Sequence, residues 1–237
     1  MTHHRQEGVM TTTFPIRVLT LFSAMATVLA SATTHAQPVS PLTIIDGGYA
    51  EQCSMAARNP QSASGILITG SRVVISPMQL CTLAIQEGGE AANRAESYNN
   101  RGVLHFAAAN FDDALADFTE AVHLKDTLTF AHINLGNIFN LREQWAQAIS
   151  AFDRAIELGI QPRPGRAGGI AESPESRQAS EARAVRELAR AHFNRGIAHE
   201  NLEQLRNAYL DYLKASELAP EWEEPRRELE RFEVIRE

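Results

Sequence analysis

The chain has 237 residues, of which 44% are hydrophobic, 7% aromatic and 22% charged. This composition excludes a wholly disordered chain and a multi-span membrane protein, and it leaves room for one or two globular domains. The 22 basic and 29 acidic residues give a net charge of −7. That balance argues against a nucleic-acid partner, because nucleic-acid-binding proteins present basic surfaces to phosphates.

The N-terminal segment has the pattern of a secretory signal peptide. Arg17 is followed by an uncharged apolar stretch at 18–32, and small residues precede a cleavage site after Ala36. As a helix, the stretch would cover about 22 Å, less than the roughly 30 Å hydrocarbon core, so cleavage is favoured over a retained anchor. We therefore expect residues 1–36 to be removed, leaving a periplasmic or secreted protein without a stable membrane span. Translation could begin at Met1 or at Met10.

Export allows a disulfide bond between the only two cysteines, Cys53 and Cys81. On the chain-entropy model the bond would stabilise the fold by roughly 3 to 4 kcal/mol. Two unlinked, buried thiols are the alternative. The cysteines do not form a CxxC motif, and residues 37–92 contain no histidine that could act as a base, so a redox or catalytic cysteine is not expected.

A 34-residue period organises the chain after residue 92. Gly102 and Gly136 lie 34 residues apart, and Gly196 follows after 60, which is 34 plus a 26-residue insertion. At equal distances after each glycine come an alanine, an aromatic residue and a second alanine: Ala114, Ala148 and Ala208; Phe118, Phe152 and Tyr212; Ala121, Ala155 and Ala215. The pattern resembles the tetratricopeptide repeat (TPR). The resemblance implies an all-α solenoid of antiparallel helical hairpins.

The repeat register divides the mature chain into five segments. These are a degenerate, disulfide-stapled N-terminal repeat at 37–92, repeats 1 and 2 at 93–160, a flexible insertion at 161–173, repeat 3 at 174–220 with its first helix extended backward by three to four turns, and a capping helix at 221–237. In the first of these we expect helices over Tyr49–Arg58 and after Ser76 and Pro77, which suit an N-cap and a first helical position. The β-prone segment 61–75 between them is an irregular insertion.

Two positions of the repeat change together. Arginine and aspartate stand there in repeats 1 and 3, whereas repeat 2 has leucine and alanine: Arg101 with Asp117, Leu135 with Ala151, and Arg195 with Asp211. We expect each Arg and Asp to form an ion pair between the two helices of its hairpin, with two separately solvated charges as the alternative. Histidines occupy other repeat positions that the family usually fills with aromatic residues, namely His105, His132, His192 and His199. They are expected to pack between helices, and no metal site is expected because further ligands cannot be placed.

The resemblance also implies a concave inner surface formed by the first helix of each hairpin. The candidate partner-binding residues on it are Asn99, Asn100, Val103, Phe106, Phe130, Ile133, Asn134, Asn137, Asn140, Arg190, Phe193, Asn194 and Ile197. Asparagine carries both a donor and an acceptor, which suits a peptide backbone. Alternatively, Asn100, Asn134 and Asn194 bond their own scaffold. The basic residues with which some family members clamp a C-terminal carboxylate are missing.

These features predict a non-enzymatic exported scaffold that binds a protein or peptide of the cell envelope and needs no cofactor. The GxSxG, HExxH, P-loop and GxGxxG motifs of common enzymes are absent. One alternative is a structural envelope subunit that self-associates through its end helices. A hydrolase or redox protein acting through the N-terminal region is the other.

Overall fold

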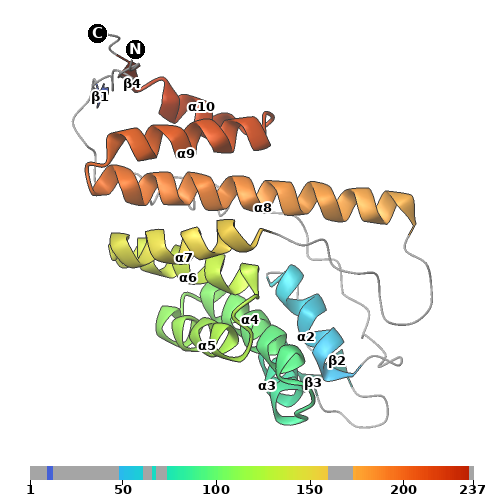
Figure 1. Cartoon of the computed structure of the whole chain (residues 1–237). Helices are drawn as coiled ribbons and strands as arrows, with labels where there is room; N and C mark the ends of the chain where they lie inside the picture. The colour runs from blue at the N-terminus through green and yellow to red at the C-terminus, as the bar shows by residue number, and fades with distance from the viewer. Residues whose placement is uncertain (1–9, 13–47, 61–65, 68–73, 160–172, 235–237) are drawn as a thin grey trace, which may run out of the picture. The chain divides into compact units, whose positions relative to one another are not determined.

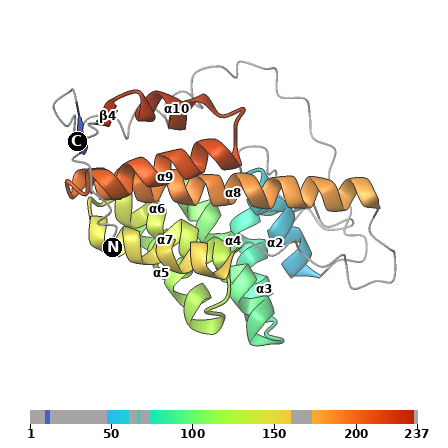
Figure 2. The same ribbon diagram turned by 45° about the horizontal axis from the view of Figure 1, so that its top comes forward.

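The computed structural model describes residues 10–12, 48–60, 66–67, 74–159 and 173–234. The chain forms two compact units, an N-terminal unit of Met25–Ile138 and a C-terminal unit that joins Met1–Ala24 to Phe139–Glu237. The described parts of both units consist mainly of helices (Figures 1 and 2). The expected signal peptide, its cleavage site and nearly all of the expected flexible insertion lie outside the described residues. An exception within the leader is strand β1, Met10–Thr12.

The N-terminal unit begins with a stapled helical hairpin. Helix α2 spans Tyr49–Arg58 and helix α3 spans Pro77–Gln86. The start of α3 follows from local chemistry, because the Ser76 hydroxyl accepts a hydrogen bond from the Gln79 amide while the Gln79 side chain accepts one from the Ser76 amide. Between the two helices, β2 (Ile66–Leu67) pairs antiparallel with β3 (Val74–Ile75). The β-prone insertion therefore contains a short strand pair.

The first regular hairpin packs against the stapled one. Helix α4 spans Ala91–Ala107 and contacts α2, α3 and the antiparallel helix α5, Phe111–Leu124. Gly102 allows the close approach of α4 and α5, because a Cβ atom built on it would lie 2.6 Å from the Phe118 ring. The buried residues Ala95, Ala121 and Ala131 join α4 and α5 to helix α6, Thr129–Leu141. Small residues thus stand where helices cross, as the repeat spacing predicted.

The C-terminal unit is built around a long helix. Helix α8 spans Pro174–Asn201 and packs against α7 (Trp145–Leu158) and α9 (Leu205–Leu218). A Cβ atom built on Gly196 would lie 2.7 Å from the Tyr212 ring. Helices α8 and α9 therefore cross as closely at this glycine as α4 and α5 do at Gly102. The backward extension of this helix was predicted from sequence, and α8 does begin at Pro174.

The C-terminal end differs from the expected capping helix over 221–237. Helix α10 covers only Glu223–Leu229, and β4, Phe232–Val234, follows it and pairs antiparallel with β1. The chain leaves the helix because Phe232 packs into the core, where its ring lies 5.8 Å from that of Tyr209 and 6.0 Å from that of Tyr212. The helical prediction was therefore wrong for 230–234, and 235–237 lie outside the described residues.

Candidate functional site

The inner face of the N-terminal unit combines carboxamides with partly exposed apolar side chains. Asn134 Nδ2 of α6 donates to Asn99 Oδ1 of α4 across 3.0 Å, which ties the two helices together. Five further candidate residues are half-buried on these helices: Asn100, Val103, Phe106, Phe130 and Asn137. Ile133 differs, because it is only 4% exposed and belongs to the core. This face can offer amide groups and apolar contacts to a ligand.

The apolar character of this face reaches the turn between α4 and α5. The rings of Phe106 and Phe111 meet edge to face with their centroids 5.5 Å apart. Phe111 is 38% exposed although it is a large hydrophobic residue, and residues 108–110 between the helices are also exposed. Phe106 is therefore held by a ring partner while part of its own surface remains accessible.

The candidate residues of the C-terminal unit divide into accessible and buried groups. Arg190 is exposed and pairs with Glu187 at 2.9 Å, and Ile197 is half-buried. Asn140 is 4% exposed, and its Nδ2 donates to the Asn194 backbone oxygen at 2.8 Å. Asn140 thus bonds the scaffold; the alternative interpretation named Asn100, Asn134 and Asn194, and of these Asn134 bonds Asn99 on the neighbouring first helix.

Phe193 was predicted as a partner-binding residue, but in the structure its side chain is buried. Only 9% of Phe193 is exposed, and its ring lies 4.8 Å from that of Trp222 and 5.4 Å from that of Tyr212. Trp222 directly precedes α10, so the segment that covers the end of the repeat also covers Phe193. Its position in the repeat does correspond to an inner-face site, but here that site is part of the core.

Arg101 and Asp117 form a two-pronged ion pair between α4 and α5. Arg101 Nε donates to Asp117 Oδ2 at 2.9 Å and Nη2 donates to Oδ1 at 2.7 Å. The hydrogen bond to Asp117 is the main cause that raises the pKa of Arg101 above its ordinary value. Nη1 donates to the Thr82 hydroxyl on α3 at 3.3 Å. The pair therefore bonds to the stapled hairpin as well as to its own.

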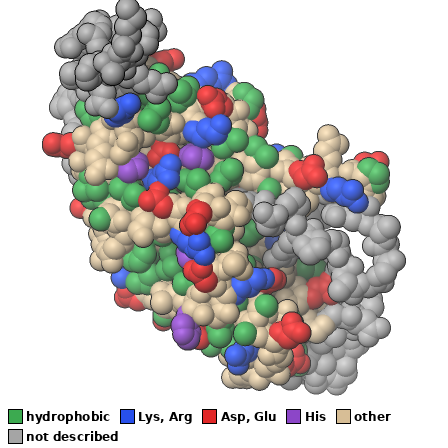
Figure 3. Space-filling model, viewed as in Figure 1, with side chains coloured by type: hydrophobic (Ala, Val, Ile, Leu, Met, Phe, Trp, Pro, Cys, Tyr) green, Lys and Arg blue, Asp and Glu red, His purple; other side chains and the backbone are tan. Residues whose placement is uncertain are grey.

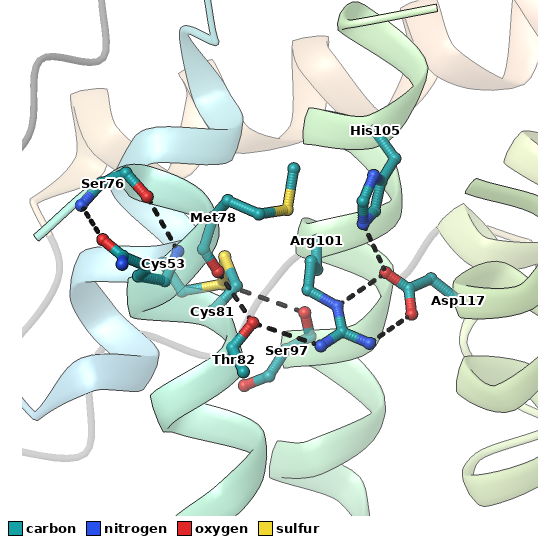
Figure 4. The surroundings of a disulfide bond; sticks show 10 residues. Cys53, Ser76, Met78, Cys81, Thr82, Ser97, Arg101, His105 and Asp117 are labelled. Atoms are coloured by element: carbon teal, nitrogen blue, oxygen red, sulfur yellow. Dashed lines mark hydrogen bonds and ion pairs between the residues drawn. A yellow bond between two sulfur atoms is a disulfide. The ribbon is translucent and has the colours of Figure 1, made fainter. Parts of the chain in front are cut away.

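The disulfide bond lies beside this ion pair (Figure 4). Cys53 and Cys81 are bonded and both are fully buried, with Leu104 of α4 in the same hydrophobic cluster. Cys53 Sγ lies 3.8 Å from the Ser97 backbone oxygen, which is also on α4. Thr82, which bonds Arg101, directly follows Cys81. The bond thus holds α2 and α3 together at the place where they meet the first repeat.

The second ion pair is part of a larger, partly buried cluster. Arg195 donates to both Asp211 carboxylate oxygens, at 2.8 and 2.7 Å, and its Nη1 lies 2.5 Å from Asp153 Oδ1 on α7. His192 Nδ1 lies 2.9 Å and His199 Nε2 lies 3.8 Å from the Asp211 carboxylate. Burial alone would raise the pKa of Asp211, but hydrogen bonds from His192 and Arg195 outweigh it and hold that pKa below its ordinary value.

A third buried polar group was not expected from the sequence. Tyr212 donates its hydroxyl to Glu200 Oε2 at 2.8 Å, and Arg231 donates to Glu200 Oε1 at 2.6 Å. Burial, followed by the nearby Glu200 charge, raises the pKa of Tyr212 well above its ordinary value. A signal was present in the sequence, because Tyr212 carries a hydroxyl where Phe118 and Phe152 carry none, and a buried hydroxyl needs a partner.

Two further properties concern the described residues only. They include no group of three or more His, Cys, Asp or Glu residues arranged to hold a metal ion. They also include no helix with the length and apolar character needed to cross a membrane. On the face in Figure 3, acidic, basic, histidine and hydrophobic side chains are interspersed.

Comparison with known proteins assigns the repeat. Residues 189–221 match the tetratricopeptide repeat family model. A 64-residue segment is 33% identical to human "Tetratricopeptide repeat protein 6". The matched segment is 27% of this chain but only 12% of the human protein. The chain contains a TPR repeat, as predicted from its sequence.

Two solved structures align with this chain at low sequence identity. A MamA double mutant aligns with a TM-score of 0.50 and 16% identity over 77% of this chain and 82% of that one. The first TPR domain of Spaghetti (RPAP3), solved with an HSP90 peptide, aligns with a TM-score of 0.46 and 19% identity over 59% of this chain and 90% of that one. The alignment with the MamA structure confirms the expected all-α TPR fold.

Proposed function

We propose that this TPR protein is an exported, non-catalytic scaffold that binds a polypeptide of the cell envelope through the inner faces of its first helices. The observation that carries the proposal is that α4 and α6 present partly exposed apolar side chains next to asparagine carboxamides. Val103, Phe106 and Phe130 are half-buried there beside Asn99 and Asn134, whose carboxamides bond each other. A peptide offers both backbone amides and apolar side chains, so it can use both kinds of surface.

The contacts of the buried carboxylates support a structural role for them rather than a catalytic one. Asp117 and Asp211 each accept two hydrogen bonds from an arginine of the same hairpin. Glu200 is likewise engaged by Tyr212 and Arg231. These carboxylates serve to join helices, which leaves the partly exposed inner-face residues as the groups available to a partner.

Export is supported by the leader pattern and by the disulfide bond. We propose a periplasmic or secreted location with cleavage after Ala36. The bonded pair Cys53 and Cys81 is fully buried, and structural disulfides of this kind persist in oxidising compartments. Cell fractionation and mass spectrometry should find a mature chain that begins at Gln37 outside the cytosol. Recovery of an uncleaved chain from the cytosol would contradict this proposal.

Site-specific photo-cross-linking tests the binding face. A benzophenone amino acid placed at Val103, on the inner face, should form adducts with a polypeptide partner in cells. The same probe at Thr119, an exposed residue of α5, is the matched control and should give no such adducts. Equal adducts at both positions, or none at Val103, would refute the proposal, and an adduct with a second copy of the chain would support the self-associating subunit instead.

A further inference from the structure

Helix α8 extends well beyond the hairpin to which it belongs. It has 28 residues, whereas its antiparallel partner α9 has 14. At 1.5 Å per residue these lengths are about 42 Å and about 21 Å. The two helices share the turn after Asn201, so the N-terminal half of α8 projects past the end of α9 (Figures 1 and 2). This projecting segment has no counterpart in the first repeat, where α4 has 17 residues.

One face of this projecting half carries a row of arginines. Arg183, Arg186 and Arg190 are all exposed, and their spacing of three and four residues places them on one side of the helix. On a helical wheel Asn194 and Ile197 lie on the same side, and together with the three arginines they span an arc of about 80°. The arginine row thus starts within the inner face of repeat 3 at Arg190 and continues it along the backward extension of α8.

Few acidic groups of α8 share this side. Glu187 lies next to it and pairs with Arg190, whose side chain is still 58% exposed. Glu181 lies on the opposite side of the helix, about 160° from Arg183 on the wheel. The arginine row contrasts with a chain whose net charge is −7. Exposed guanidinium groups gathered on one helix face favour an anionic ligand, because they can hold carboxylates in two-pronged geometry.

The spacing fits an extended acidic peptide. Along the helix axis Arg183 and Arg186 are about 4.5 Å apart, and Arg186 and Arg190 about 6 Å apart. Side chains on one side of an extended peptide repeat about every 6.6 Å. This repeat is close to the Arg186–Arg190 spacing, and the flexible side chains of Arg183 and Arg186 can adjust to it. Ile197 offers an apolar contact farther along the same side. Three arginines are few for a nucleic acid or an anionic membrane, which proteins bind through larger basic surfaces.

We propose that Arg183, Arg186 and Arg190 bind an acidic segment of the partner, with Asp or Glu at alternating positions. The inference rests on the proposed function, since it assigns a chemistry to the polypeptide held by the inner faces. It differs from recognition of a terminal carboxylate within a repeat, because Arg183 and Arg186 lie in the backward extension of α8, before the residues 189–221 that match the repeat model. The site therefore accepts internal acidic segments and needs no free C-terminus.

Fluorescence anisotropy tests the proposal with a labelled twelve-residue peptide that alternates glutamate and serine, blocked at both ends. The full exported protein should bind it at least tenfold more tightly than the same peptide with glutamine in place of glutamate. Arg183→Glu combined with Arg186→Glu should abolish this preference. Arg177→Glu combined with Lys214→Glu makes the same change in net charge elsewhere on the C-terminal unit and should leave the preference intact.

Each other outcome overturns the inference. Equal loss in the control variant would show a non-specific charge effect, and equal affinity for the glutamine peptide would show that carboxylates are not recognised. Tighter binding of oligo-dT or of phosphatidylserine vesicles would assign the arginines to another ligand. The photo-cross-linking at Val103 separates the two proposals, because adducts that persist in the Arg183→Glu, Arg186→Glu variant would leave the scaffold function standing without the arginine row.

Discussion

Replacing Asp117 by alanine removes the carboxylate that joins α5 to α4. Its side chain is 6% exposed, and Arg101 would lose two hydrogen bonds of 2.9 and 2.7 Å. The Arg101 guanidinium would then be left without its carboxylate in a site where only 21% of the side chain is exposed. Breaking a buried pair from one side costs about 3 to 5 kcal/mol. We expect about 3 kcal/mol here, because the partial exposure of Arg101 allows some hydration.

Repeat 2 shows which substitution should compensate. It carries Leu135 and Ala151 where repeat 1 carries Arg101 and Asp117. The variant with both Arg101→Leu and Asp117→Ala buries no unpaired charge and keeps an apolar side chain in place of the arginine stem. It should therefore lose only about 1 kcal/mol, since a buried ion pair often contributes little more than apolar residues of similar size. The double variant is thus expected to be more stable than Asp117→Ala alone.

Urea unfolding followed by circular dichroism measures these differences. The exposed Asp112 of α5, replaced by alanine, is the control, and it should lose less than about 1 kcal/mol because surface charges contribute little. A double variant that is as unstable as Asp117→Ala, or less stable, would refute the reasoning. In that case the pair itself, rather than the unpaired charge left behind, would account for the loss.

Three further predictions concern other buried features. Gly102→Ala should cost about 1 to 3 kcal/mol through overlap with Phe118, and a smaller residue at 118 should recover part of that loss in the same urea assay. Reducing the bond between Cys53 and Cys81, which closes a separation of 28 residues, should lower the free energy of unfolding by about 3.5 kcal/mol, and thiol titration should find no free thiol before reduction. Because the folded-state pKa of Asp211 is depressed, its stabilisation is present above the unfolded-state pKa and is lost as pH falls through the folded one. The difference in unfolding free energy between the wild type and Asp211→Asn should therefore shrink as the pH falls below about pH 4, and a difference that stays constant from pH 4 down to about pH 2.5 would contradict the assignment.

Local and periodic features of the fold could be predicted from the sequence. Ser76 and Pro77 mark the start of α3 because capping involves residues adjacent in the chain. Comparison between repeats singled out Arg101 with Asp117, which are 16 residues apart and bonded in the structure. The signal was their joint replacement by an apolar pair in repeat 2, which compares positions within one sequence.

Features that depend on how the array ends could not be predicted in the same way. Phe193 occupies an inner-face position of the repeat, but Trp222 covers it. Glu200 is buried because Arg231 reaches it from beyond α10. Both contacts come from the segment after the last repeat, where the periodic pattern ends and the helix stops at Leu229. Repeat spacing describes neighbours within the array and contains no information on such a segment.

Because the disulfide is completely buried, its rate of reduction measures local opening of the N-terminal unit. Both sulfur atoms belong to residues with no exposed surface, so a dissolved reductant reaches them only when the packing of α2, α3 and α4 around the bond opens. The rate of reduction therefore reports how often this hairpin opens, separately from unfolding of the whole chain. While the bond is intact, the open form keeps its two helices tethered, and closure requires only a local search rather than a new encounter of distant segments.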